Sequence, residues 1–206
     1  MKLTEEQLEM AKLHVTQMSS DLNFYNKLTE AEYESFKEFI GKPQRILELG
    51  CGLGRMSVYI NKQLDYEPEF ILADFDEISK KIKYGWNPGN IFYNKLEITR
   101  QFCIENNLRR FEIFNLAERN ISELKNVDLV ISVMSVGFHY PIEQYMKTLL
   151  NITTQDVVMI FGIRKINAVH VYNTDSFKKY FQKTTFRDVD LKTKEHIMIL
   201  ENKIWN

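Results

Sequence analysis

The sequence lacks several features that mark specialised protein classes. Its 206 residues hold only two cysteines, Cys51 and Cys103, with no CxxC pair, which excludes a disulfide framework and argues against a metal site. No apolar run approaches the ~20 residues that a membrane-spanning helix needs. The first residues, MKLTEEQLEM, are charged and lack the apolar core of a secretory signal. We therefore expect a cytoplasmic protein that binds no membrane.

A surplus of charge of one sign is also missing. The 27 Lys and Arg residues nearly balance the 28 Asp and Glu residues, for a net charge of -1. This balance gives no electrostatic footprint for a nucleic-acid backbone. What is present is an ordinary globular composition, 44% hydrophobic and 27% charged. We expect a small-molecule partner and no nucleic acid, and a homodimer is compatible with the sequence.

No repeat or linker rich in proline and glycine divides the chain, which predicts one domain over residues 1–206. Within it, residues 1–43 form an N-terminal helical extension. One helix over residues 5–18 has apolar side chains at helical spacing: Leu8, Ala11, Val15 and Met18. A second helix has a capping box of Thr29 and Glu32 and stops at Gly41. Their apolar faces either pack against the sheet edge or cover the substrate mouth.

From residue 44 to 206, short apolar runs alternate with helical patterns. The predicted strands cover residues 45–50, 69–76, 111–115, 127–134 and 155–163. The predicted helices lie at 56–64, 77–83, 94–106, from Pro141 to Leu149, and at 175–182. This alternation favours a mostly parallel sheet with helices on both faces.

The tail departs from this alternation. Strands at 186–192 and 195–202 are joined by a connection too short for a parallel crossover, so they must be antiparallel neighbours. We therefore predict an α/β fold, namely a Rossmann-like, seven-stranded, mostly parallel sheet with an antiparallel last strand.

The strongest motif is ILELGCGLG at residues 46–54. Gly50, Cys51 and Gly52 form the turn after the first strand, and Gly54 opens the next helix. Glycine lets backbone approach a ligand closely, and open α/β sheets bind ligands beyond the carboxyl ends of their strands. Asp74 follows Gly54 by 20 residues, where its carboxylate can accept both hydroxyl hydrogens of a ribose. The alternative is a tight turn with a surface aspartate.

ILELGCGLG followed by ILAD resembles the class I S-adenosylmethionine-dependent methyltransferases, over roughly residues 44–200. A nicotinamide-binding fingerprint would need glycine at position 55, where this chain has Arg55. The resemblance implies S-adenosylmethionine as cofactor. It also implies a set of donor-binding residues: Glu48, Gly50, Cys51, Gly52, Gly54, Asp74, Phe75, Asn115, Leu116 and Met134.

Within this set the resemblance implies distinct roles. The Gly50–Gly52 turn faces the methionine part of the donor, and Glu48 supports that turn. Asp74 holds the ribose, and Phe75 packs on the adenine. Asn115 stands where the family often has an adenine-reading aspartate, and its side-chain carbonyl oxygen can still accept a hydrogen bond.

The acceptor is expected beyond Met134, in the segment SVGFHYP. This segment has no Asn/Asp-Pro-Pro-Tyr motif, no acidic pair and no cysteine, which disfavours several methyltransferase types. His139 is the candidate catalytic base, because imidazole accepts protons near neutral pH. The alternatives are that His139 only hydrogen-bonds the acceptor or only fixes the loop. Tyr140 is a candidate substrate contact.

SVGFHYPIEQY and YGWNPGNIFYNKLE also resemble segments of bacterial sugar O-methyltransferases of surface-polysaccharide pathways. This implies a sugar or nucleotide-activated sugar as acceptor, with Trp86 in an aromatic platform. Arg164 is a candidate for binding a phosphate, and His170 is a second candidate for handling protons. Three other functions stay open: methylation of another small N- or O-acceptor, donor binding without catalysis, and a nicotinamide-dependent oxidoreductase.

Overall fold

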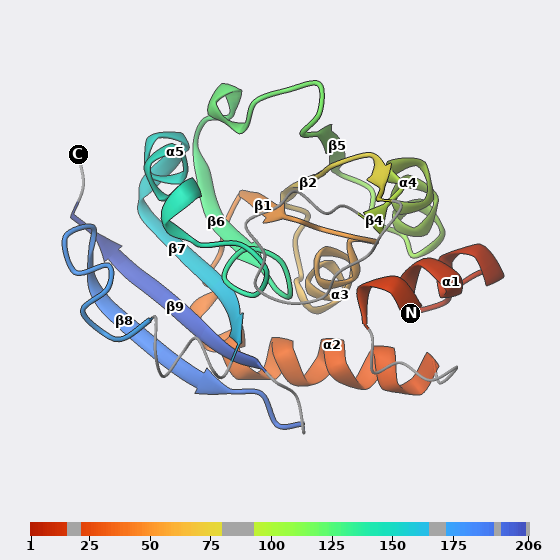
Figure 1. The fold of residues 1–206 in the computed structure, drawn as a ribbon, viewed down its shortest axis with the longest axis horizontal. Coiled ribbons are helices and arrows are strands. Elements are labelled where there is room, and N and C mark those ends of the chain that lie inside the picture. Colours follow the sequence, from red (N-terminus) through yellow and green to blue (C-terminus); the bar gives the residue numbers. More distant parts are fainter. Residues whose placement is uncertain (16–21, 80–92, 165–171, 192–194, 205–206) are drawn as a thin grey trace.

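A computed structural model describes residues 1–15, 22–79, 93–164, 172–191 and 195–204. Its main feature is a seven-stranded sheet in the order β5-β2-β1-β6-β7-β9-β8 (Figure 1). The strands are β1 Arg45–Leu49, β2 Glu69–Asp74, β5 Phe111–Asn115, β6 Val127–Ser132, β7 Thr153–Arg164, β8 Phe181–Asp188 and β9 Glu195–Lys203. β9 runs antiparallel to both neighbours, whereas β5, β2, β1, β6 and β7 are parallel. The predicted seven-stranded sheet with an antiparallel last strand is confirmed.

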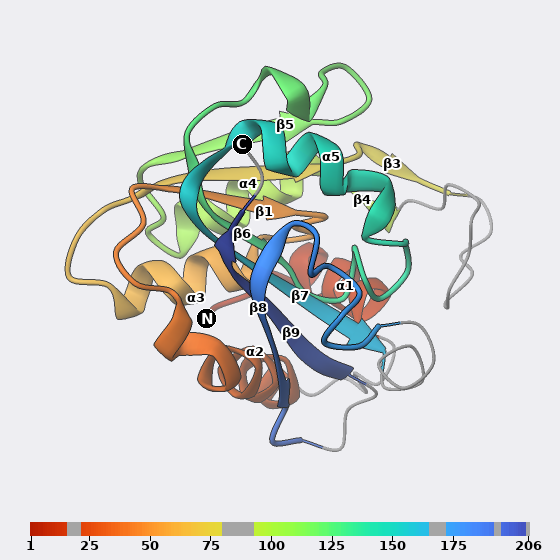
Figure 2. The same ribbon diagram turned by 90° about the vertical axis from the view of Figure 1, so that its left-hand side faces the viewer.

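Helices cover both faces of this sheet, as predicted. They are α1 Glu5–His14, α2 Leu22–Phe36, α3 Arg55–Gln63, α4 Leu96–Glu105 and α5 Glu143–Ile152, with short 3-10 turns at Lys37–Phe39 and Ile121–Glu123. Alternate residues of each strand point to opposite sides. Ile46 joins the core beneath α1–α4, and Leu47 joins the core beneath α5. Figure 2 shows α5 on one side of the strands and α2 and α3 on the other. None of the helices within the described ranges is long and apolar enough to cross a membrane.

The two N-terminal helices have different partners. α1 packs against α4 and the short strand β4 (Tyr93–Asn94), and α2 packs against α3, β8 and β9. α1 begins at a capping box made by Thr4 and Gln7 and ends at His14, earlier than predicted. α2 already begins at Leu22, so the predicted capping box of Thr29 and Glu32 is wrong. Both residues lie inside the helix, where their side chains accept hydrogen bonds from the buried Arg55 guanidinium.

Two predicted helices are absent from the residues that the structure describes. Residues 77–78 form the short strand β3 (Glu77–Ile78), which pairs with β4; residues 80–83 lie outside the described part. Residues 174–180 form turns, and β8 begins at Phe181. Phe177 and Phe181 are both 1% exposed, so the turns bury these rings without a helix.

Candidate functional site

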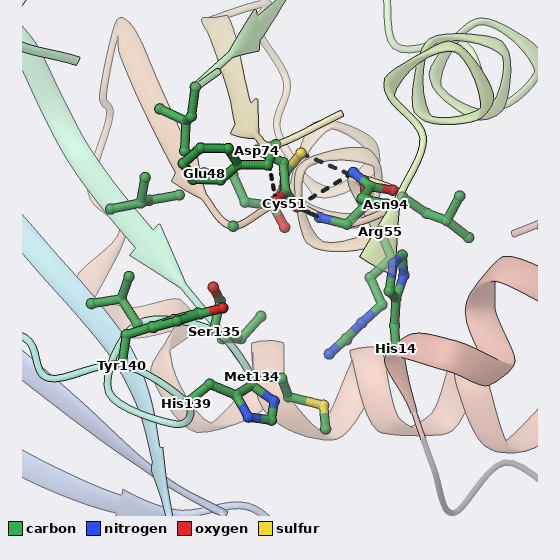
Figure 3. Close-up of a pocket in the computed structure, with 18 of the residues that line it drawn as sticks. His14, Glu48, Cys51, Arg55, Asp74, Asn94, Met134, Ser135, His139 and Tyr140 are labelled. Carbon is green, nitrogen blue, oxygen red and sulfur yellow. Dashed lines mark hydrogen bonds between the residues drawn. The ribbon is translucent and has the colours of Figure 1, made fainter. Parts of the chain in front are cut away.

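A cavity opens at the carboxyl ends of β1, β2 and β6 (Figure 3). It is lined by His14, Val15, Tyr25, Glu48, Leu49, Gly50, Cys51, Gly52, Leu53, Arg55, Asp74, Phe75, Asn94, Leu116, Val133, Met134, Ser135, Val136, His139, Tyr140 and Tyr145. Residues at the ends of the strands form the centre of the cavity wall, and the end of α1 and the start of α2 complete it. The N-terminal helices therefore pack on the core, and residues of both also line the cavity.

The glycine turn has a shape that side chains would block. Gly50 has a φ of +69°, and a Cβ there would lie 1.9 Å from the Ser135 Oγ. Gly52 has a φ of +53°, and its Cβ would lie 2.9 Å from the imidazole of His14. Both dihedrals are in the left-handed region that glycine adopts without strain. The turn is thus held between Ser135 on one side and His14 on the other.

The peptide groups of Gly52 are fixed by three side chains. Its N–H donates to the Asp74 Oδ2 at 2.8 Å. Its carbonyl oxygen accepts from the Asn94 Nδ2 at 3.0 Å and from the Thr99 hydroxyl at 2.7 Å. Asn94 and Thr99 carry no motif, so the sequence did not indicate them. The pairing of β3 with β4 is what brings Asn94 to the turn.

Asp74 also accepts from the backbone N–H of Phe75 at 2.8 Å and from Asn94 at 3.3 Å. Desolvation nevertheless raises the pKa of Asp74 to about 6, against the lowering effect of these hydrogen bonds. A carboxylate that has lost its hydration is stabilised by further hydrogen bonds from hydroxyl groups. The hydroxyl groups of a ribose would supply them, so the site fits a nucleoside.

Glu48 lies below the turn and is 3% exposed. One of its oxygens accepts from the Ser57 N–H at 3.0 Å and from the Ser57 hydroxyl. This satisfies an N–H in the first turn of α3, which has no internal partner. Burial raises the pKa of Glu48 to about 7, although the Ser57 hydrogen bonds lower it. Glu48 thus ties the turn to the helix that follows.

A buried ion pair adjoins the cavity. The Arg55 guanidinium donates to both carboxylate oxygens of Glu32 and, at 3.0 Å, to the Thr29 hydroxyl. It also lies 5.7 Å from the ring centre of Tyr25. Thr29 and Glu32 are therefore partners of Arg55. This contact joins α2 to the start of α3, directly after the glycine turn.

A second carboxyl group, that of Glu195, lies beside this pair. Burial raises the pKa of Glu195 well above its ordinary value, and the adjacent Glu32 raises it further. Glu195 is 1% exposed, and this burial favours its protonated form.

The facing wall is the turn after β6. Met134 has a φ of +61°, and the Ser135 carbonyl then accepts from the N–H of His139 at 2.7 Å. The Arg164 Nε donates to the Phe138 carbonyl at 3.0 Å, and its guanidinium lies 4.5 Å from the Phe138 ring centre. His139 is 8% exposed and faces the cavity across from Asp74 (Figure 3).

Most of the predicted site residues meet in this cavity. From the donor set these are Glu48, Gly50, Cys51, Gly52, Asp74, Phe75, Leu116 and Met134, and from the acceptor set His139 and Tyr140. Three predicted residues, Gly54, Asn115 and Arg164, are not in the wall formed by the described residues. The Asn115 side-chain oxygen accepts from the Ala117 N–H at 3.0 Å and closes a turn. Trp86 and His170 lie outside the described residues.

Among the residues that the structure describes, no three histidine, cysteine, aspartate or glutamate side chains are grouped to hold a metal ion. Cys51 is a free, buried thiol whose pKa is raised by burial and by the nearby Asp74 carboxylate. It is therefore a neutral part of the wall.

No family model matches the sequence, and no curated protein matches it either. Known structures do share its fold. A Methanococcus maripaludis protein described as an S-adenosylmethionine-dependent methyltransferase matches with a TM-score of 0.60 and 13% identity, over 100% of this chain and 99% of the other. TYW2 of M. jannaschii in complex with AdoMet matches with a TM-score of 0.55 and 11% identity, over 92% and 79%.

A Nostoc punctiforme protein described as an O-methyltransferase matches with a TM-score of 0.56 and 11% identity. That match covers 86% of this chain but only 56% of the other. The chain has the fold of the class I S-adenosylmethionine-dependent methyltransferases. Its glycine turn and Asp74 lie at the carboxyl ends of the central strands of that fold, where open α/β sheets bind ligands.

Proposed function

We propose that this chain is an S-adenosylmethionine-dependent O-methyltransferase that methylates a hydroxyl group of a small molecule. One observation carries the proposal: a single cavity has the glycine turn and Asp74 on one wall and His139 on the facing wall. The methyltransferase fold supports this, as do the O-methyltransferases and the AdoMet complex among the structures similar to it.

The donor half of the cavity is formed by chemically distinct groups. Gly50 and Gly52 leave room for the methionine part of the donor, and Asp74 accepts hydrogen bonds from the ribose. Phe75 and Leu116 supply the apolar contact for the adenine. The donor supplies a methyl group that its own sulfonium activates, so the protein's task is to align and desolvate the reactants.

In the acceptor half, His139 takes the proton of the acceptor hydroxyl as methyl transfer proceeds. His139 is largely shielded from solvent, and its backbone N–H donates to the Ser135 carbonyl. General-base catalysis of this kind contributes about 10²–10⁴-fold to a rate. Tyr140 and Tyr145 add aromatic surface next to His139.

The acceptor class that we propose is a sugar or a nucleotide-activated sugar. Aromatic rings such as those of Tyr140 and Tyr145 suit the apolar face of a sugar ring. Arg164 lies directly behind the loop of residues 135–140, where its charge favours an acceptor that carries phosphate. The sequence resemblance to bacterial sugar O-methyltransferases points to the same class.

Calorimetry with S-adenosylhomocysteine and with NAD tests the donor half. Binding of the first and not of NAD is expected, and the reverse result would show an oxidoreductase. A set of activated sugars with labelled donor, followed by mass spectrometry for a gain of one methyl group, tests the acceptor half. Donor binding without any methylated product would favour a non-catalytic module.

The variant His139→Ala tests the proposed base. We expect kcat to fall by about 10²–10⁴-fold while the affinity for S-adenosylhomocysteine stays within about twofold. An unchanged kcat would instead favour an amine acceptor. The lone pair of a neutral amine can attack the methyl group without a base to remove a proton first.

A further inference from the structure

The cavity contains a second imidazole on the wall opposite to His139. His14 is the last residue of α1, and its ring lies on the Cα face of Gly52, where a Cβ would be 2.9 Å from its Cε1 and Nδ1 atoms. Figure 3 shows His14 beside Asn94, on the side of the glycine turn. The sequence motifs did not single out His14 itself.

The glycine turn itself offers few donors to an anion. Both Gly50 and Cys51 donate their N–H groups to the Ala73 carbonyl, at 2.8 and 3.2 Å. The Gly52 N–H donates to Asp74, and the Gly54 N–H donates to the Cys51 carbonyl at 2.8 Å. The four amides of these residues are thus used within the protein. A side chain that donates a hydrogen bond would therefore help to hold an anionic group next to the turn.

The charged side chains beside the turn leave few candidates. Glu48 and Asp74 are carboxyl groups, which do not attract an anion. Arg55 lines the cavity, but its guanidinium is bound to both oxygens of Glu32 and to Thr29. Among the described residues of this wall, His14 has its ring directly on the turn, and an imidazole donates an N–H in either protonation state.

We propose that His14 binds the carboxylate of the donor's methionine part, so that the end of α1 belongs to the donor site. The inference rests on the proposed function, which places that part of the donor against the Gly50–Gly52 turn. His14 then makes the protein specific for donors that carry an amino-acid carboxylate. A nucleoside thioether without this group would bind through Asp74 and the apolar wall alone.

The test uses two ligands that differ only in this carboxylate: S-adenosylhomocysteine and its decarboxylated form, S-adenosyl-3-thiopropylamine. Calorimetry measures both with the unchanged protein and with His14→Phe, His14→Gln and Lys12→Gln. Phenylalanine keeps a ring on Gly52 but has no N–H, glutamine keeps an N–H donor, and Lys12 lies on the same helix in an exposed pair with Glu9.

We expect His14→Phe to weaken binding of S-adenosylhomocysteine about tenfold or more and to change binding of the decarboxylated ligand by less than about twofold. His14→Gln should recover part of the loss, and Lys12→Gln should bind both ligands as the unchanged protein does. Equal losses for both ligands, or no loss in His14→Phe, would overturn the proposal, because His14 would then only pack. If the unchanged protein binds neither ligand, the proposed function itself fails.

Discussion

Arg55 provides the sharpest test of how the N-terminal helices stabilise the protein. Its side chain is 7% exposed and that of Glu32 is 0% exposed, so the pair is almost fully removed from water. The variant Arg55→Met removes the positive charge and keeps most of the apolar volume. Glu32 is then left beside Glu195 without a counter-charge, in a place where burial already raises the pKa of Glu195 well above its ordinary value.

Breaking a buried ion pair from one side typically costs about 3–5 kcal/mol, because the other charge stays buried and unpaired. We expect this loss in the free energy of unfolding of Arg55→Met at pH 7.5, measured by urea denaturation. For a chain of this size it corresponds to a fall in Tm of roughly 6–20 °C. The double variant Arg55→Met/Glu32→Leu removes both charges and should recover most of the loss.

The pH dependence gives an independent check. Burial disfavours the charged form of a carboxyl group that has lost its counter-charge, so the destabilisation should be smaller near pH 4.5 than at pH 7. The reasoning is refuted if Arg55→Met costs less than about 1 kcal/mol, or if the double variant is no more stable than the single one.

Three further predictions concern the donor side of the cavity. Gly50→Ala should destabilise the protein by about 1–3 kcal/mol more than Gly41→Ala in urea denaturation, because both have positive φ but only Gly50 faces Ser135 at 1.9 Å; equal losses would contradict the close contact. Thr99→Val should cost about 1 kcal/mol and weaken binding of S-adenosylhomocysteine in calorimetry, because it removes a 2.7 Å bond to the turn; Thr99→Ser should keep both. The free energy of unfolding should fall as pH rises from about 4.5 to 7, since the pKa of Glu48 is about 7 in the folded protein and its protonated form is favoured there. Glu48→Gln should flatten this slope in denaturation series at several pH values, and an unaltered slope would contradict the raised pKa.

The sequence was sufficient for the sheet because its strands are short apolar runs with clear boundaries. FEIFN is a strand over the predicted residues 111–115, and the run before Gly50 is β1. The antiparallel last strand followed from the length of one connection alone. These are local patterns, and burial on both faces of the sheet reinforces them.

Prediction failed where a local pattern had a tertiary cause. Thr29 and Glu32 have the spacing of a capping box, but that spacing also places two side chains on one face of a helix. In the folded protein this face meets Arg55, which lies 26 residues after Thr29 in the chain. Asn94 was missed for a similar reason, because the distant strand pairing with β3 brings it to Gly52.

The same contacts change how the N-terminal extension is understood. His14 of α1 lies on Gly52, and Glu32 of α2 pairs with Arg55, so both helices hold the stretch from Gly52 to Arg55. That stretch runs from the glycine turn after β1 to the first residue of α3. Without residues 1–43, Arg55 would lose its counter-charge and the turn would lose one of the two side chains that enclose it. The boundary at residue 43, which the sequence suggests, therefore does not separate two independently stable parts. The glycine turn depends on contacts with residues 1–43 to keep its shape.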